Sequence, residues 1–118
     1  MTCITKRYKQ RDRAWKVGYK CLIPEGKNYV SPCYRTVFEP GVTSRVTTHH
    51  ILTTYESGFH IWKRKRDAQY DVIKGSEKVV KVLYRKCVAE GFHSCGTILS
   101  MKQAPCIIAK EMKICITK

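Results

Sequence analysis

Four consecutive basic residues, Lys63-Arg64-Lys65-Arg66, directly follow Trp62. Adjacent cations beside an indole are typical of a surface that contacts a phosphate backbone and offers a stacking platform for a base. The run also matches a basic nuclear-localisation signal, and it fits the solvated face of a short helix after a core tryptophan. We predict polyanion contact at these five residues and leave the other two interpretations open.

The first 14 residues form a second basic patch. Its cations are Lys6, Arg7, Lys9, Arg11 and Arg13. Basic residues continue at Lys16 and Lys20, and the patch is interleaved with Tyr8, Trp15 and Tyr19. This mixture suits single-stranded or structured RNA, because cations meet phosphates and ring faces meet bases. We expect residues 1–14 to be a mobile arm, or a short helix that orders on a partner, with an ordinary basic terminus as the alternative.

Residue patterns that would carry catalysis or metal binding are weak. The sequence has no glycine-rich phosphate loop, nucleophile elbow or paired-carboxylate motif. His49 and His50 with Glu56 would offer a general base and a carboxylate, but adjacent strand residues face opposite sides. His93 with the nearby cysteines matches no zinc-ligand spacing. We predict no enzyme, no metal and no cofactor, and keep an enzyme with a His/Glu site as an alternative.

Length, charge and cysteine content limit the class of protein. A chain of 118 residues with 43% hydrophobic residues is long and apolar enough for one folded domain with a core. Lys and Arg number 23 against 9 acids, and the formal net charge of +14 exceeds what solubility needs. This excess indicates an anionic partner. Seven cysteines, an odd number, and the absence of a visible signal peptide or membrane span favour reduced thiols and an intracellular location.

Strand patterns dominate the chain. Residues 15–23 alternate apolar with small or basic residues, and residues 78–88 place Val80, Val82 and Tyr84 on one face. Lys81, Leu83 and Arg85 then fall on the other face. We also expect strands at residues 34–38, within the β-branched segment 42–54, and at 58–62. The fold class that follows is α+β: a small, mostly antiparallel β domain with one short helix, at residues 63–73.

The last third of the chain is expected to be more broken. Glycines and polar residues predict a loop at 90–96, and Pro105 separates two short apolar runs at 97–101 and 106–109. Residues 111–118 alternate cleanly and are expected to form an exposed edge strand. We divide the chain into a basic N-terminal arm at 1–14 and a single globular β-rich domain at 15–118.

Four short motifs carry a resemblance over residues 15–90. They are Trp15-x-x-Gly18-Tyr19-Lys20, Gly58-Phe59-His60, Asp67-Ala68 and Val79-Val80-Lys81-Val82. In this order they resemble short uncharacterised proteins of bacteriophages and large DNA viruses. The resemblance implies a viral protein, and no functional residue is carried over from it.

Together these features predict a small basic non-enzymatic protein, of viral type, that binds an anionic macromolecule: DNA, RNA or an acidic protein surface. It would act inside the cell, in the host cytoplasm or nucleus, or in the virion. The alternative is a minor structural protein of a virion, in the capsid or as cement, which joins other chains through an edge strand.

Overall fold

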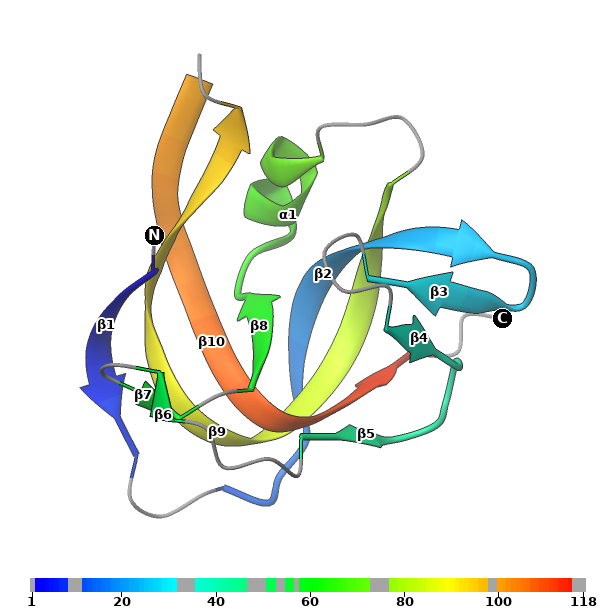
Figure 1. Ribbon diagram of the computed structural model, residues 1–118, viewed down its shortest axis with the longest axis horizontal. Helices are drawn as coiled ribbons and strands as arrows, with labels where there is room; N and C mark the ends of the chain where they lie inside the picture. The colour runs from blue at the N-terminus through cyan, green and yellow to red at the C-terminus, as the bar shows by residue number, and fades with distance from the viewer. Residues whose placement is uncertain are drawn as a thin grey trace.

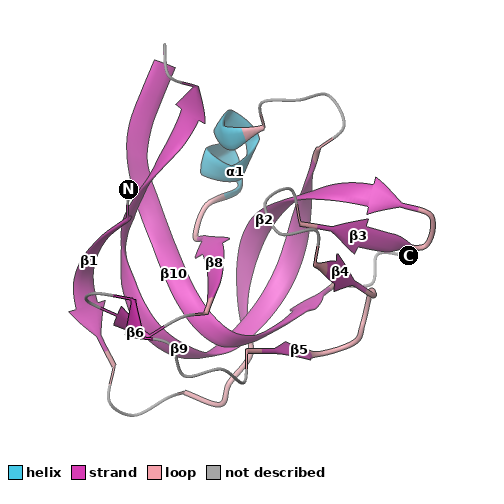
Figure 2. Cartoon of the chain, viewed as in Figure 1, coloured by secondary structure: helices cyan, strands magenta, loops and turns pink. Residues whose placement is uncertain are grey.

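Among the residues that it describes, the computed structural model has ten strands and one helix. It describes residues 2–8, 12–31, 36–46, 51–52, 55–56, 58–72, 77–97 and 100–115. The elements are β1 (Thr2–Arg7), β2 (Lys16–Glu25), β3 (Asn28–Val30), β4 (Val37–Phe38), β5 (Ser44–Arg45), β6 (Ile51–Leu52), β7 (Tyr55–Glu56), β8 (Phe59–Trp62), α1 (Lys65–Asp71), β9 (Lys78–Thr97) and β10 (Ser100–Ile114). The α+β class, mostly antiparallel with one short helix, is confirmed (Figure 2).

One curved sheet organises the domain. Its strand order is β1-β9-β10-β8-β2-β3-β4, and β2 also pairs with β9. The strands β9, β10, β8 and β2 therefore close on one another as a ring of antiparallel pairs. Figure 1 shows β9 and β10 as two long, strongly bent strands that run along most of the molecule.

The inside of this ring holds the main core. It includes Leu22, Ile61, Val82 and Met112, all fully buried. The alternation predicted for residues 78–88 is confirmed, because Val80, Val82 and Tyr84 all belong to this core. Gly18 allows the close approach of β2 to β8, since a Cβ there would lie 2.4 Å from Ile61 Cγ2.

Helix α1 packs on the other side of the sheet. Ala68, on its inner side, is fully buried together with a second cluster of side chains. That cluster contains Cys21, Trp62, Cys95, Ala104 and Cys106. Figure 1 shows α1 between the free end of the β9–β10 hairpin and β2. The helix thus covers one end of the outer side of the sheet, and no other described helix lies over the rest of that side.

Several predicted boundaries are wrong. Residues 90–96 are not a loop but the second half of β9, which pairs with β1 as well as β10. Strand β10 runs through Pro105, which lies opposite Phe92. Residues 111–114 are not at an edge, because β10 lies between β9 on one side and β8 and β5 on the other. Residues 116–118 lie outside the described part of the chain.

Candidate polyanion-binding face

The basic run at residues 63–66 lies at the start of α1 with all four side chains exposed. Two of these cations already have carboxylate partners. Arg64 Nε lies 2.7 Å from Asp67 Oδ2, and Lys63 Nζ lies 3.8 Å from Glu90 Oε2. Lys65 and Arg66 are exposed on the first residues of the helix. The run therefore offers charge to a partner, but part of it also holds the helix to the sheet.

Trp62 cannot serve as the predicted stacking platform. Its side chain is only 7% exposed and belongs to the cluster beneath α1. Strand pairing places Trp62 opposite Cys106 of β10, and the His93 ring lies 5.8 Å from its own ring. The alternative in which a core tryptophan precedes an exposed basic helix start agrees with this burial.

The N-terminal patch is also placed differently from the expectation. Residues 2–7 form β1, an edge strand paired with β9, rather than a mobile arm or a short helix. Lys6 is exposed, with its Nζ 4.9 Å from the centroid of the Tyr8 ring. Arg13 is exposed just before β2. Lys9 and Arg11 lie outside the described residues.

On strands β2, β9 and β10, and at Trp15 just before β2, some side chains point away from the core of the domain. They form a separate surface, which we call the outer face. Its members are Trp15, Val17, Tyr19, Lys81, Leu83, Arg85 and Lys113. Strand register places them in rows, because Tyr19 lies opposite Lys81, Val17 opposite Leu83, and Leu83 opposite Lys113. On β9 and β10 their neighbours along the strand, other than Lys86, belong to the core, and on β2 Gly18, between Val17 and Tyr19, packs against Ile61 of the core. Side chains of a strand alternate between its two sides.

The outer face is open to solvent beyond the end covered by α1. Val17 is 45% exposed and Lys81 is exposed, while Tyr19 and Trp15 are half-buried. Tyr19 lies opposite Trp62 of β8 as well as Lys81 of β9, so the basic start of α1 begins beside the Tyr19 end of this face. A continuous strip therefore runs from residues 63–66 to Trp15.

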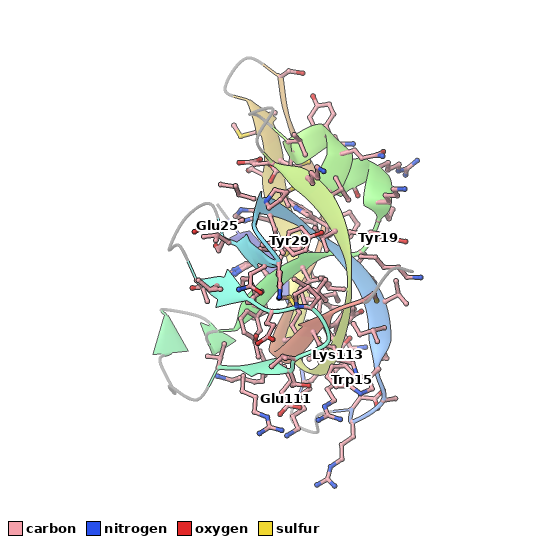
Figure 3. The ribbon with its side chains drawn as sticks, turned by 90° about the vertical axis from the view of Figure 1, so that its right-hand side faces the viewer. Trp15, Tyr19, Glu25, Tyr29, Glu111 and Lys113 are labelled. Carbon is pink, nitrogen blue, oxygen red and sulfur yellow. The ribbon has the colours of Figure 1, made fainter. Side chains whose placement is uncertain are left out.

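Two cations lie against the ring of Trp15. The Arg85 guanidinium carbon is 4.2 Å and the Lys113 ammonium is 4.5 Å from the centroid of its ring. Figure 3 shows Trp15 and Lys113 next to each other, with Tyr19 farther along the same side. Cation–π contacts of this kind fix the indole against the sheet and gather positive charge around it.

Glu111 organises the basic residues next to Trp15. Its carboxylate is buried and is shared by Arg45, Arg85 and Lys86, with Arg45 Nε 2.8 Å from Oε2 and Arg85 Nε 2.5 Å from Oε1. Lys86 Nζ lies 3.3 Å from Oε2. The backbone of Lys86 has a positive φ of 57°. Burial alone would raise the pKa of Glu111, but hydrogen bonds from Arg85 and Lys86 hold it below its usual range. One negative charge thus holds three positive ones in place, and the group stays cationic.

Burial shifts the pKa values of two described histidines and of several described thiols away from neutrality. Burial lowers the pKa of His60 to about 4, with a further contribution from Lys20, and burial also lowers the pKa of His93. Burial raises the pKa of Cys21 to about 12 and of Cys106 to about 11, so both thiols are protonated at neutral pH. The cysteines at 21, 87, 95, 106 and 115 are free, which fits the prediction of unpaired thiols for these five.

Within the described residues, no three His, Cys, Asp or Glu side chains come together as a metal site. The alternative site of His49, His50 and Glu56 cannot be described, because both histidines and the Glu56 side chain lie outside the described parts. None of the helices in the described chain has the length and apolar character needed to cross a membrane.

Searches of protein-family models, curated proteins and solved structures gave no match to this chain. The sequence patterns included Trp15, Tyr19, Lys81 and Arg85 but did not place them together. Arg45, Glu111 and Lys113 were not predicted as site residues, since strand register alone brings them beside Trp15.

Proposed function

We propose that this protein is a non-enzymatic domain that binds a phosphate polymer through its outer face and the basic start of α1. The observation that carries the proposal is the pair of cation–π contacts that Arg85 and Lys113 make with Trp15, on a part of the sheet that α1 does not cover. Cations gathered around an aromatic ring supply phosphate contacts and a planar surface together. The formal net charge of +14 supports the same class of partner.

The proposal extends the interface predicted from the sequence. Lys65 and Arg66 at one end of the strip, and Lys81 and Lys113 on the outer face, are separate sources of charge for one bound chain. Salt bridges with Asp67 and Glu90 position Arg64 and Lys63 at the same end. We expect a phosphate polymer to follow the strip from α1 toward Trp15.

A salt titration tests the proposal. Binding of duplex DNA, single-stranded RNA, inorganic polyphosphate and an acidic polypeptide is measured at several salt concentrations with reduced protein. For duplex DNA, log K is expected to fall with log salt by about 0.9 for each phosphate contacted. Replacing Lys81 and Lys113 with alanine should lower this slope by roughly one to two units.

The matched control replaces Lys27 and Lys78, two exposed lysines outside the outer face, and removes the same charge. We expect a clearly smaller change of slope in the control. Equal slopes for the two double variants would mean that only net charge acts. Binding to the acidic polypeptide alone would replace the phosphate polymer with an acidic protein as the partner.

The alternative of a structural role in an assembly is supported by a different strand from the one predicted. Strand β1 lies at an end of the sheet order, so one side of its backbone is free of described strand partners. Such an edge can pair with another chain. Sedimentation of the isolated protein distinguishes assembly from polyanion binding alone. Concentration-dependent association that is lost in Ile4→Pro would favour assembly. A monomer at high concentration would count against it.

A further inference from the structure

We infer that the phosphate polymer bound by the outer face is single-stranded nucleic acid, with bases stacked against Trp15 and its Arg85 partner and against Tyr19. This inference rests on the proposed function and specifies its ligand. A duplex hides the faces of its bases inside the stack, whereas a single strand can present them to aromatic rings.

Two aromatic side chains are spaced along one direction of the face. Trp15 and Tyr19 are four residues apart on the same side of β2 and its N-terminal extension, which corresponds to about 13 Å at the usual strand rise. Val17 lies between them and is 45% exposed, so apolar surface continues from one ring to the other. Such a surface can hold a short run of unstacked bases. A site that bound phosphates by charge alone would not need these aromatic and apolar side chains.

The cations beside Trp15 differ in how firmly they are held. Glu111 anchors Arg85 through its Nε, so the guanidinium stays over the indole. A fixed guanidinium plane extends the stacking surface, because bases stack on arginine as well as on aromatic rings. Lys113 reaches the ring through a flexible stem, and its ammonium can turn to a phosphate when a base takes its place.

Phosphate contacts and stacking can be separated experimentally. Phosphate contacts determine the dependence of affinity on salt, whereas stacking adds affinity that depends little on salt. Inorganic polyphosphate provides the first contribution without the second. A stacking surface therefore predicts that Trp15→Ala weakens the binding of a single-stranded oligonucleotide much more than the binding of polyphosphate.

The test uses oligo(dT), oligo(rU), a duplex of equal length and polyphosphate, with tryptophan fluorescence and affinity as readouts. Oligonucleotides are expected to quench the fluorescence of Trp15, while Trp62, only 7% exposed, serves as the internal reference. Trp15→Ala should weaken oligonucleotide binding by roughly 5- to 150-fold and leave its salt slope within one unit of the wild type. Polyphosphate affinity should change by less than about threefold.

Trp15→Phe guards against an effect on folding, because it keeps an aromatic ring beside Arg85 and should retain most of the oligonucleotide affinity while losing the quench. The inference is overturned if Trp15→Ala lowers the oligonucleotide and polyphosphate affinities equally. The proposed function survives that result, since polyanion binding with a steep salt dependence would remain. Failure of every polyanion to bind would overturn both.

Discussion

Replacing Glu111 with glutamine is expected to lower the free energy of unfolding by about 3 kcal/mol while strengthening polyanion binding. The carboxylate is 3% exposed and balances Arg45, Arg85 and Lys86. Without it, three cations are left close together, one on strand β5 and two on strand β9. Breaking a buried ion pair costs about 3–5 kcal/mol, and we expect the low end because Arg45 and Lys86 reach solvent.

The opposite signs of the two effects make this prediction specific. A substitution that merely damaged the fold would reduce both stability and binding. Urea unfolding gives the first quantity and a salt titration with polyphosphate gives the second. Glu39→Gln is the matched control, since Glu39 is exposed and its substitution changes the charge equally. A similar loss of stability in both variants would show that Glu111 has no organising role.

The same carboxylate makes stability depend on acid. Its pKa in the folded chain is lower than the ordinary glutamate value of 4.5, which applies to the unfolded chain. Its contribution is therefore complete above 4.5 and is lost as the pH falls through the lower folded-state value. The stability difference between wild type and Glu111→Gln should shrink in that acidic range and stay constant between pH 6 and 8. A difference that does not vary with pH would contradict the paired state of Glu111.

The local patterns of the sequence predicted the inward and outward sides of strands well. The alternation of Val80 and Val82 with Lys81 and Leu83 follows from the period of a strand, and it holds because both sides meet different environments. The same rule predicts that Met112 and Ile114 face the core, as they do. Such patterns identify which residues lie on the outer face, strand by strand.

Pairing between distant strands could not be predicted in this way. Gly91 looks like a loop residue, yet it is buried where β9 pairs with Ile4 of β1 and Cys106 of β10. Pro105 usually marks a strand end, but β10 continues through it and its carbonyl accepts a hydrogen bond from Lys63. The conformation of these segments depends on contacts with residues far away in the sequence, such as Ile4 for Gly91 and Lys63 for Pro105. Local composition holds little information about such contacts.

The buried acids were the main signal missed for the site. Aspartate and glutamate are almost never fully buried unless they are paired, and nothing in the local sequence around Asp67 or Glu111 indicates burial. In a chain with 23 basic residues and 9 acids, each acid has many possible partners. The structure shows that these two hold basic residues of several elements together, which gives the positive surface a fixed shape.

Replacing Asp67 with alanine is the second substitution with a large expected effect. Asp67 is fully buried on α1, where Arg64 Nε lies 2.7 Å from Oδ2 and Lys102 Nζ lies 3.0 Å from Oδ1. Burial alone would raise its pKa, but Lys102 and Arg64 hold the pKa below its usual range. The carboxylate therefore joins the start of the helix to strand β10 as a charged group. We expect Asp67→Ala to lower the free energy of unfolding by about 3–5 kcal/mol.

A double-mutant cycle with Lys102→Met tests whether the pair itself is responsible. Removing both partners should cost less than the sum of the single substitutions, with a coupling of about 0.5–3 kcal/mol. Lys102 also lies 4.6 Å from the centroid of the Tyr70 ring, so Tyr70→Leu, which removes the ring, is the control for that cation–π contact. Additive effects of Asp67→Ala and Lys102→Met would show that the helix is held to β10 by packing around Ala68 and not by this ion pair. Strong coupling would show that Asp67 joins α1 to β10 while its other oxygen holds Arg64. Because Asp67→Ala also releases Arg64, we expect it to strengthen polyphosphate binding less than Glu111→Gln does, although each substitution removes one negative charge.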